Sequence, residues 1–530
     1  MTLAPNAAPT RDAATAAAAT AERLLTAATA ATTRKERRSA KRLGTLLADD
    51  DGRDLLLDLT DQVLRIRDRT RAAHRLRDLV RNGVPASLGL IDGTGLRMLG
   101  AIAPYVPRLA EWAVDWRVGR ETTGVILPGE DAPLTRYLAR RRADGFGLNV
   151  NVLGEAILGD DEADSRVDLV TSRVRRPDVD YISIKISALC ANLDALAWDH
   201  SLARVTERLT ALYRIAREHR TFVNLDMEEH RDLELSIESF VAVLDQPEFH
   251  DLPAGIVLQA YIPDSHVALA RLITWANARH ASGGAPIKIR LVKGANLAME
   301  QVEAEQHDWP QAPYLTKADV DASYKLMLET AISTSTPGAV RLGIASHNLF
   351  DVAWALTVRD ALDDPTMIEI EMLEGMAPAQ ARAVRDAAGS LLLYAPVVEK
   401  ADRDASIAYL SRRLDENSGP ENFLRSLFDL APGSPAWIRE RQRFHHSLER
   451  RREIVTTSHR DQDRRSESLT FPADGTFGNV ADTDFTTAGN RAWAEQILRQ
   501  DPPGEPGLVT ETAAIDDIVV RARAAQQRWA

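Results

Sequence analysis

The sequence contains a single cysteine, Cys190, among 530 residues. One cysteine allows no disulfide within the chain and no cysteine-rich zinc site, which is typical of proteins that fold in a reducing compartment, so we expect a cytoplasmic location. The chain also lacks an apolar run of the roughly 20 residues that a membrane-spanning helix needs. The sequence therefore predicts a protein that is soluble or attached only to the surface of a membrane.

Basic residues are outnumbered, with 65 Lys and Arg against 77 Asp and Glu, and the net charge is −12. Such a chain repels phosphate backbones, so we do not expect it to bind nucleic acid. Hydrophobic residues make up 45% and charged residues 27%, which excludes a chain that is disordered throughout. At about 150 residues per domain, the length predicts three or four domain-sized units.

Residues 1–33 are rich in Ala and Thr but nearly lack Leu, Ile, Val and Phe. They cannot form the apolar core of a secretory signal, and we expect a disordered or weakly helical tail. Over residues 34–143 the apolar residues recur at helical spacing, which predicts a helical N-terminal domain. The basic run within residues 34–42 is interpreted as a solvated helix face, with an anionic partner as the alternative.

Eight short runs rich in apolar and β-branched residues follow, and their starts lie 24 to 53 residues apart. That spacing fits a strand, a crossover helix and two loops, so the pattern predicts a (β/α)8 TIM-like barrel over residues 144–430, closed by a helix at about 405–416. The predicted strands are 148–152, 181–186, 221–225, 255–260, 287–292, 340–344, 367–372 and 391–394.

The segment after the barrel is polar, and residues 431–484 are predicted to be a linker. Residues 515–529 again carry apolar side chains at helical spacing, and the chain then stops without a helix-capping signal. We therefore expect residues 485–530 to be the start of a further domain.

Polar side chains stand at the carboxyl end of every predicted strand, where the chemistry of such barrels is placed. Parallel barrel strands are buried on both faces, so a charge such as Lys185 or Arg290 must be paired or must contact a ligand. The residues at these ends are Glu155, Lys185, Asp226, Glu228, Gln259, Arg290, Lys293, Ser346, His347, Asn348, Glu374 and Tyr394.

Two adjacent arginines, Arg412 and Arg413, lie in the helix predicted after the last strand. Paired guanidinium groups beside a barrel mouth are suited to bind a carboxylate. We find no clustered metal ligands and no Gly-x-Gly-x-x-Gly after a strand. Spacing alone thus predicts a barrel that binds an anionic small molecule, and it leaves the reaction open.

The strand-end segments resemble a known family. In order along the chain they are LNVNVLGEAILG, YISIKISAL, FVNLDMEE, VLQAYIPD, IKIRLVKGA, SHN, EMLEGM, YAPV and YLSRRLDEN. Together they are similar to the flavin-dependent proline dehydrogenase domain of the bifunctional proline utilization A family. The resemblance extends over about residues 63–428.

This resemblance implies an FAD enzyme that oxidises L-proline to 1-pyrroline-5-carboxylate by hydride transfer to flavin N5. It also implies a quinone as electron acceptor, which leaves open a peripheral contact with the inner face of the membrane and a homo-oligomer. The chain departs from the family pattern at Asn296 and Leu297, where aromatic residues commonly stand beside the flavin, so flavin stacking is expected to differ.

Carried over by motif, Arg412 and Arg413 would hold the proline carboxylate with Lys185, and Tyr394, Leu373 and Ala295 would wall the substrate. Asp226, Arg290, Lys185 and Tyr394 would be the catalytic group, with Arg290 near flavin N5. The FAD contacts implied by the resemblance are Gln259, Arg290, Val292, Lys293, Gly294, Ala295, Thr316, Lys317, Ser346, His347, Asn348 and Glu416.

Residues 485–530 are similar to the opening of the fused glutamate-semialdehyde dehydrogenase domain of that family, which uses NAD. We therefore expect an incomplete bifunctional chain that carries the first activity, without the NAD-dependent one. Two other classes stay open: a lyase that forms a Schiff base at Lys185 or Lys293, and a binding protein whose barrel has lost its activity.

Overall fold

The computed structural model describes residues 11–38, 49–64, 66, 68–109, 112–113, 125–154, 157, 159–399, 406, 409, 423, 430–467, 479–500 and 511–529. The chain forms two compact units, residues 1–460 and residues 461–530. The helix predicted over residues 405–416 lies almost wholly outside the described residues.

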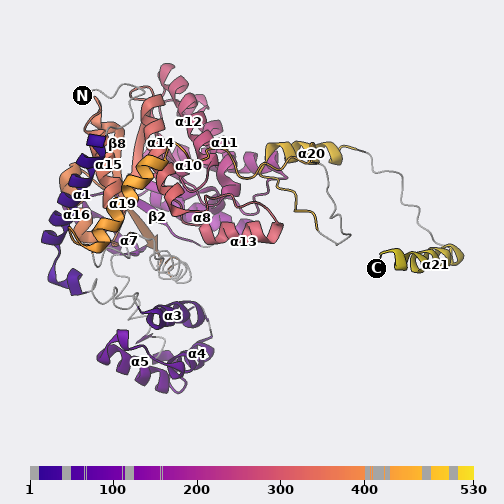
Figure 1. Cartoon of the computed structure of the whole chain (residues 1–530), viewed down its shortest axis with the longest axis horizontal. Helices are drawn as coiled ribbons and strands as arrows, with labels where there is room; N and C mark the ends of the chain where they lie inside the picture. Colours follow the sequence, from indigo (N-terminus) through magenta and orange to yellow (C-terminus); the bar gives the residue numbers. More distant parts are fainter. Residues whose placement is uncertain are drawn as a thin grey trace. The chain divides into compact units, whose positions relative to one another are not determined.

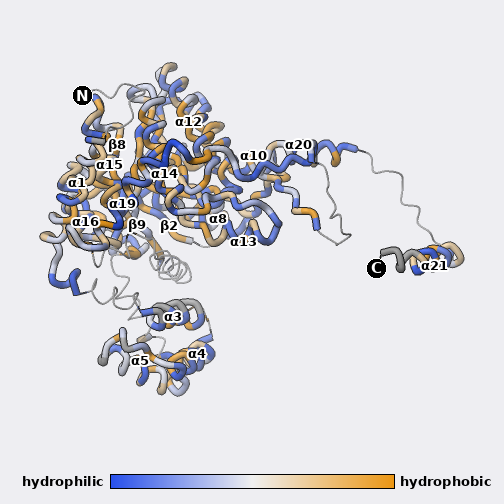
Figure 2. The backbone as a smooth tube through the Cα atoms, viewed as in Figure 1, coloured by the Kyte–Doolittle hydropathy of each residue, from blue (hydrophilic) through white to orange (hydrophobic). Residues whose placement is uncertain are grey.

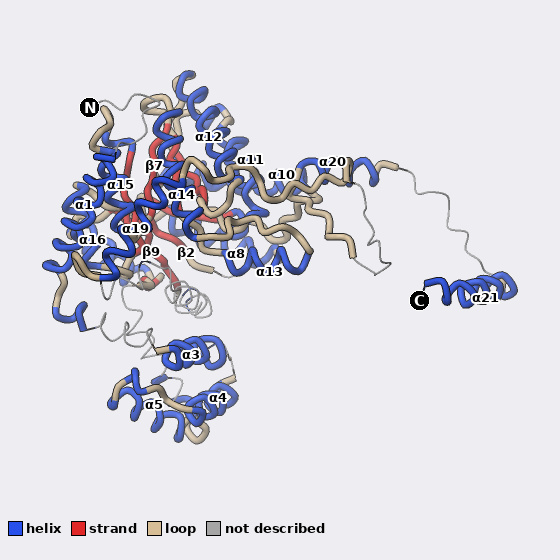
Figure 3. The backbone as a smooth tube through the Cα atoms, viewed as in Figure 1, coloured by secondary structure: helices blue, strands red, loops and turns tan. Residues whose placement is uncertain are grey.

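A closed ring of eight parallel strands forms the centre of the first unit (Figures 1 and 3). Strand β9 pairs with both β2 and β8 and so closes the ring, and the short strand β1, Leu127–Pro128, adds to β9 outside it. The ring strands are β2 (Gly147–Val152), β3 (Tyr181–Lys185), β4 (Phe222–Asp226), β5 (Ala254–Gln259), β6 (Ile287–Val292), β7 (Val340–Ala345), β8 (Ile368–Leu373) and β9 (Leu392–Val398). The predicted (β/α)8 barrel is confirmed.

Helices cover the outside of the ring and are joined to the strands by short loops (Figure 3). The longest interval between strands holds two helices, α13 and α14. The covering helices are α7 (Asp131–Ala143), α8 (Asp160–Val174), α9 (Ile186–Leu189), α10 (Trp198–His219), α11 (Leu233–Leu244), α12 (Asp264–Ala281), α13 (Leu297–His307), α14 (Lys317–Thr334), α15 (Leu349–Arg359) and α16 (Pro378–Ala388).

The barrel interior is polar, although the strands are buried apolar runs on their outer side. Strand β6 carries Lys288 and Arg290 two residues apart, and β8 carries Glu369 and Glu371 at the same spacing. Side chains two apart point to one face of a strand, so these four charges face one another across β7. At the β7 position between them stands Gly343, where a Cβ atom would lie only 2.1 Å from Glu371 Oε1.

The N-terminal segment predicted as a disordered or weakly helical tail is instead a packed helix. Helix α1, Arg11–Ala31, lies against α15 and α16 of the barrel (Figure 1). Its buried face consists of small and aliphatic side chains, among them Ala17, Ala21 and Leu24. Small side chains let the helix approach the barrel closely, so packing stabilises a sequence that would be a marginal helix alone.

The helical section predicted after the tail has its own small core. Helices α3 (Asp50–Leu59), α4 (Arg69–Asn82) and α5 (Leu90–Ile102), with the single turns Thr60–Leu64 and Ala86–Leu88, bury Leu55, Val63 and Leu76 against one another. Asp68 caps α4 by accepting a hydrogen bond from Arg71 N at 2.7 Å.

The segment predicted as a linker begins with a helix that belongs to the barrel. Helix α19, Pro435–Arg450, packs on α14 and α15, and its Trp437 and Phe444 rings lie 4.6 and 5.6 Å from the Phe350 ring. The helix packs on the barrel because residues 436–448 form an apolar face at helical spacing, and such a face is stable only when it is buried.

The second unit contains helices α20, Ala488–Leu498, and α21, Thr512–Trp529. The tube around α20 is mainly hydrophilic (Figure 2). Residues 461–467, predicted as part of the linker, are held to it: Asn490 donates to Gln462 Oε1 at 2.9 Å and accepts from Arg464 N at 2.8 Å. Buried Asn490 therefore organises this unit.

Candidate functional site

A cavity of about 1190 Å³ opens at the carboxyl ends of the barrel strands. The strands end there, so each one contributes its last polar side chains to the same space. Fifteen of the predicted catalytic, substrate-binding and cofactor-binding residues line it: Lys185, Asp226, Gln259, Arg290, Val292, Lys293, Gly294, Ala295, Thr316, Lys317, Ser346, His347, Asn348, Leu373 and Tyr394. Four others, Glu155, Arg412, Arg413 and Glu416, lie outside the described residues.

Arg290 is buried at the floor of the cavity between two carboxylates. Its Nη1 donates to Asp226 Oδ1 at 2.9 Å, and its Nε donates to Glu371 Oε2 at 2.6 Å. Burial alone would lower the pKa of the guanidinium, but the Glu371 and Asp226 carboxylates raise it, so Arg290 is cationic. Its Nη2 is buried and has no hydrogen-bond partner among the described residues.

Asp226 joins four groups at the end of β4. Its Oδ1 accepts hydrogen bonds from Ser183 Oγ at 3.0 Å, Asn224 Nδ2 at 2.9 Å and Arg290, while Oδ2 accepts one from the Tyr394 hydroxyl at 2.9 Å. Burial and the Asp226 carboxylate raise the pKa of Tyr394 well above its usual value, so the phenol stays protonated. The four bonds fix the ring of Tyr394 relative to Arg290.

Lys185, at the end of β3, forms an ion pair with Glu228 from the loop after β4. Glu228 Oε2 also accepts from Ser187 Oγ at 2.8 Å, and its backbone carbonyl accepts from Asn296 Nδ2 at 2.8 Å and Gln259 Nε2 at 3.2 Å. The loop after β4 is thus held by residues from β3, β5 and the loop after β6. Asn296, where the family commonly has an aromatic residue, performs part of this holding.

Two residues at the cavity wall, Gln259 and Gly294, are suited to contact a ligand. Gln259 Oε1 is buried without a hydrogen-bond partner among the residues that the structure describes. Gly294 has φ of +121°, and a Cβ there would lie 2.2 Å from the Tyr261 ring. Only glycine fits this turn, which keeps the chain close to Tyr261 and leaves the wall of the cavity smooth.

Lys293 follows β6 and reaches acidic residues on two helices, α14 and α15. Its Nζ is 2.5 Å from Asp321 Oδ1 on α14 and 2.7 Å from Asp351 Oδ2 on α15. Burial opposes its charge, but the two carboxylates raise its pKa. A lysine that stays protonated is a poor nucleophile, and Lys185 is also ion-paired, which disfavours the Schiff-base lyase.

The segment after β7 orders the third side of the cavity. Asn348 caps α15 by accepting from Phe350 N at 3.0 Å, and His347 Nε2 accepts from Leu373 N at 3.0 Å. The second bond ties the end of β8 to the loop after β7. Leu373 is thereby fixed at the cavity wall.

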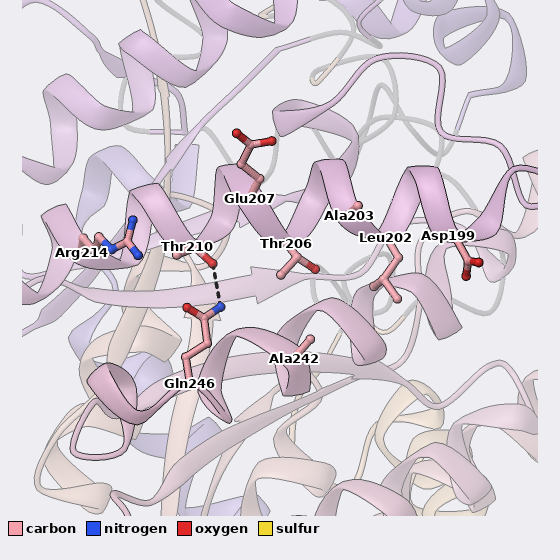
Figure 4. A pocket seen from close by; sticks show the side chains of 9 residues that line it. All are labelled: Asp199, Leu202, Ala203, Thr206, Glu207, Thr210, Arg214, Ala242 and Gln246. Carbon is pink, nitrogen blue, oxygen red and sulfur yellow. Dashed lines mark hydrogen bonds between the residues drawn. The ribbon is translucent and has the colours of Figure 1, made fainter.

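A second, shallower hollow of about 560 Å³ lies between α10 and α11 on the outside of the barrel (Figure 4). Gln246 donates to Thr210 Oγ1 at 3.0 Å across it. None of the predicted site residues lines this hollow.

Among the described residues, no group of three or more His, Cys, Asp or Glu side chains is arranged to hold a metal ion. In the same part of the chain, no helix is both long and apolar enough to cross a membrane.

A sequence model described as proline dehydrogenase matches residues 134–426, more than half of the chain and all eight strands of the ring. The chain belongs to the proline dehydrogenase family. This confirms the family, and with it the enzyme class, that the strand-end motifs predict.

Curated relatives agree with this family. The chain is 28% identical over 256 residues to the bifunctional protein PutA of Klebsiella aerogenes, which is 47% of this chain and 19% of that protein. It is 29% identical over 189 residues to proline dehydrogenase of Deinococcus radiodurans, which is 35% of this chain and 53% of that one. The match therefore spans about a fifth of the bifunctional relative and about half of the shorter one.

Solved structures are similar over most of the chain. PutA from Corynebacterium freiburgense has 39% identity and a TM-score of 0.64, covering 80% of this chain and 41% of that chain. PutA from Bdellovibrio bacteriovorus has a TM-score of 0.72 at 24% identity, covering 92% of this chain and 48% of that one, and supports the fold.

Three residues that shape the site of this proline dehydrogenase family member were not predicted from the sequence. Glu371 binds Arg290, while Asp321 and Asp351 bind Lys293. The sequence contains an indication of the role of Glu371. Two acidic residues in a buried strand need cationic partners, and β6 carries two cations at the same two-residue spacing. Asp321 and Asp351 lie within helices, and the sequence contains no such indication for them.

Proposed function

We propose that this chain oxidises L-proline to 1-pyrroline-5-carboxylate in the barrel cavity, with FAD as cofactor. The observation that carries the proposal is that the residues assigned by motif to proline and to FAD, wherever they are described, line one cavity of a proline dehydrogenase barrel. This arrangement disfavours the alternative of a binding protein whose barrel has lost its activity, because such a protein does not need the whole set around one cavity.

The cavity residues fit a flavin. Arg290 Nη2 is a buried donor and Gln259 Oε1 a buried acceptor, both without hydrogen-bond partners among the described residues, and both residues line the cavity. A flavin ring carries acceptors and a donor on its edge, so it can satisfy both. When bound, FAD supplies the acceptor for the hydride that leaves the carbon next to the proline nitrogen.

The chain's own residues would orient the substrate. The ammonium of Lys185, with Arg412 and Arg413 by family resemblance, would bind the carboxylate. Tyr394 and Leu373 would wall the ring. Asp226 would hold the Tyr394 hydroxyl and Arg290 in fixed positions. The guanidinium charge of Arg290 would then already lie near flavin N5, where negative charge develops, so the site would not need to reorganise during the reaction.

The fates of the electrons and of the product are proposed from resemblance. A quinone would reoxidise the cofactor, in peripheral contact with the membrane or free of it. Residues 485–530 would belong to an NAD-dependent glutamate-semialdehyde dehydrogenase domain. Reduction of a soluble quinone analogue by the proline-reduced protein would test the first point.

The deciding experiment is one spectrum. Purified full-length chain should show the flavin absorbance at roughly 450 nm, and anaerobic L-proline should bleach it. L-Alanine, which has the amine and carboxylate but no ring, is the control and should leave it unchanged. A protein that neither carries nor takes up flavin would contradict the proposal, and a borohydride-trapped adduct would support the lyase instead.

Arg412→Met tests the carboxylate assignment. Loss of one arm of the clamp should cost on the order of 2–4 kcal/mol of proline binding, measured as a rise in KM for proline. An unchanged KM would show that Arg412 does not bind the carboxylate.

A further inference from the structure

A cluster of three lysines and two aspartates lies behind one wall of the cavity. We call it the lysine–aspartate cluster: Lys293 after β6, Lys317, Asp321 and Lys325 on α14, and Asp351 on α15. The α14 residues are four apart, so they share one face of the helix. Lys293 and Lys317 line the cavity, and the other three stand behind them.

The carboxylates are shared between the lysines. Asp321 binds Lys293 at 2.5 Å and Lys317 at 2.8 Å, and Asp351 binds Lys293 at 2.7 Å and Lys325 at 2.8 Å. Each aspartate therefore bridges two ammonium groups. Burial would raise the pKa of both carboxyl groups, but the lysines lower it, so both are ionised.

The rear of the cluster is sealed from water. Lys325 and Asp351 are 1% and 2% exposed, and the Phe444 ring from α19 lies 5.4 Å from Lys325 Nζ. Charges in such a place are poorly screened and act strongly over several ångströms.

Three ammonium groups face two carboxylates, so the cluster carries one positive charge in excess. A purely structural network would gain by exact neutrality, because an unbalanced buried charge is costly. The excess is directed toward the cavity, where the two lysines of the front layer stand. An anionic ligand in the cavity would balance it.

We propose that Lys325 is a positioning residue for cofactor binding: it compensates part of the charge of Asp351, which also pairs with Lys293, so that Lys293 and Lys317 together present the excess positive charge of the cluster to the diphosphate of a flavin dinucleotide. This inference rests on the proposed function, because it takes the cavity ligand to be FAD. Lys325 itself does not line the cavity.

The test is a series of variants that changes the charge of the cluster. Lys325→Met makes the cluster neutral, Asp351→Asn gives an excess of two, and the double variant K325M/D351N returns to one. FAD should bind the flavin-stripped full chain about tenfold more weakly in K325M, more tightly in D351N, and within about threefold of the original chain in the double variant.

Riboflavin has the flavin ring but no phosphate. Its affinity should therefore change only if a variant damages the structure of the site. Its dissociation constant should stay the same across the series, and the FAD differences should shrink as salt is raised. Arg279→Met is the control: it removes another buried cation, which donates to the backbone carbonyls of Leu244 and Phe249 at 2.6 Å and does not line the cavity. It should leave both affinities unchanged.

The outcomes separate this inference from the proposed function. If the original chain is bleached by proline but FAD affinity does not follow the charge, or if riboflavin moves in parallel with FAD, the role of Lys325 is wrong. If K325M does not fold, D351N and the double variant still differ only in the charge of Lys325, so FAD should bind more weakly in the double variant than in D351N. If the chain binds FAD with the predicted charge dependence but proline does not bleach the flavin, the proposed function is wrong and the role of Lys325 is not contradicted.

Discussion

Two buried charge networks border the same cavity, and they differ in their balance. The Arg290 network consists of Asp226, Arg290, Glu371 and Lys288, so two buried cations match two buried anions inside the ring of strands, and Lys288 also pairs with the partly exposed Glu369. The lysine–aspartate cluster, between α14 and α15, has one cation in excess. Residues of the same kinds are therefore arranged in two ways: the matched buried charges hold the geometry of the site, and the excess charge is what we propose to attract the anionic cofactor.

Breaking the balance of the Arg290 network should have the largest effect. Arg290→Met leaves Glu371 with Lys288 alone and Asp226 without a cation, in a place where unpaired charge is costly. We expect the barrel to lose about 3–5 kcal/mol of unfolding free energy, measured by urea denaturation with tryptophan fluorescence.

The matched control is Arg214→Met, which removes an exposed pair with Glu248 on the outside of the barrel. It should hardly change the denaturation midpoint. Equal effects of the two substitutions would refute the contrast between buried and exposed pairs.

Acid should weaken the side of the barrel around α14 before it affects the Arg290 network. Burial lowers the pKa of His266, on α12, from 6.5 to about 4, and its Nε2 is hydrogen-bonded to Ser323 Oγ of α14 at 2.9 Å. Because the unfolded chain binds this proton first, stability is full above pH 6.5 and falls as the pH drops toward 4, by at most about 3 kcal/mol.

Unfolding midpoints of the original chain and His266→Asn at pH 7.5 and 4.5 check this, and the variant should lose less on acidification. In the Arg290 network, burial would raise the pKa of Glu371, but Arg290 and Lys288 lower it below its usual 4.5, so its contribution declines only under more acidic conditions. The same pH dependence in both proteins would exclude His266 as the cause.

The smallest effect is expected at the edge of the Arg290 network. Tyr394→Phe keeps the ring but removes the hydroxyl that donates to Asp226 at 2.9 Å. The barrel should lose about 1–2 kcal/mol, measured by the same urea denaturation. Flavin content should be unchanged, and a loss of flavin would show that the phenol also holds the cofactor.

Most of the ring could be predicted because its strands are short apolar runs between loop signals. The strand predicted at 287–292 is β6 to the residue. The last strand was predicted over residues 391–394, yet β9 continues to Val398 and includes Pro396. On one side of β9 the pairing with β8 ends at Tyr394, and the pairing with β1 starts at Val397. Pro396 lies between these two pairings, so its missing N–H faces no strand on that side and the proline is tolerated.

Other features could not be predicted because they depend on contacts between distant segments. Helix α1 is weak by composition and becomes stable only by packing on α15 and α16. Asp321 and Asp351 lie 30 residues apart in two helices, and their carboxylates come together around Lys293. Strand ends indicate where a cavity forms, but the residues behind its wall are visible only in the folded chain.

Gly343 determines which acid the guanidinium of Arg290 can hold. A methyl group at this position would occupy the space of the Glu371 oxygen, 2.1 Å away. It would also lie 2.8 Å from Lys288 Cε. A library of all twenty amino acids at position 343 should therefore recover glycine, because a larger residue would displace both members of the Glu371–Lys288 pair. A residue with no reactive group thus sets the chemistry of its neighbours by size alone, which makes it the first position to hold constant when such a barrel is redesigned.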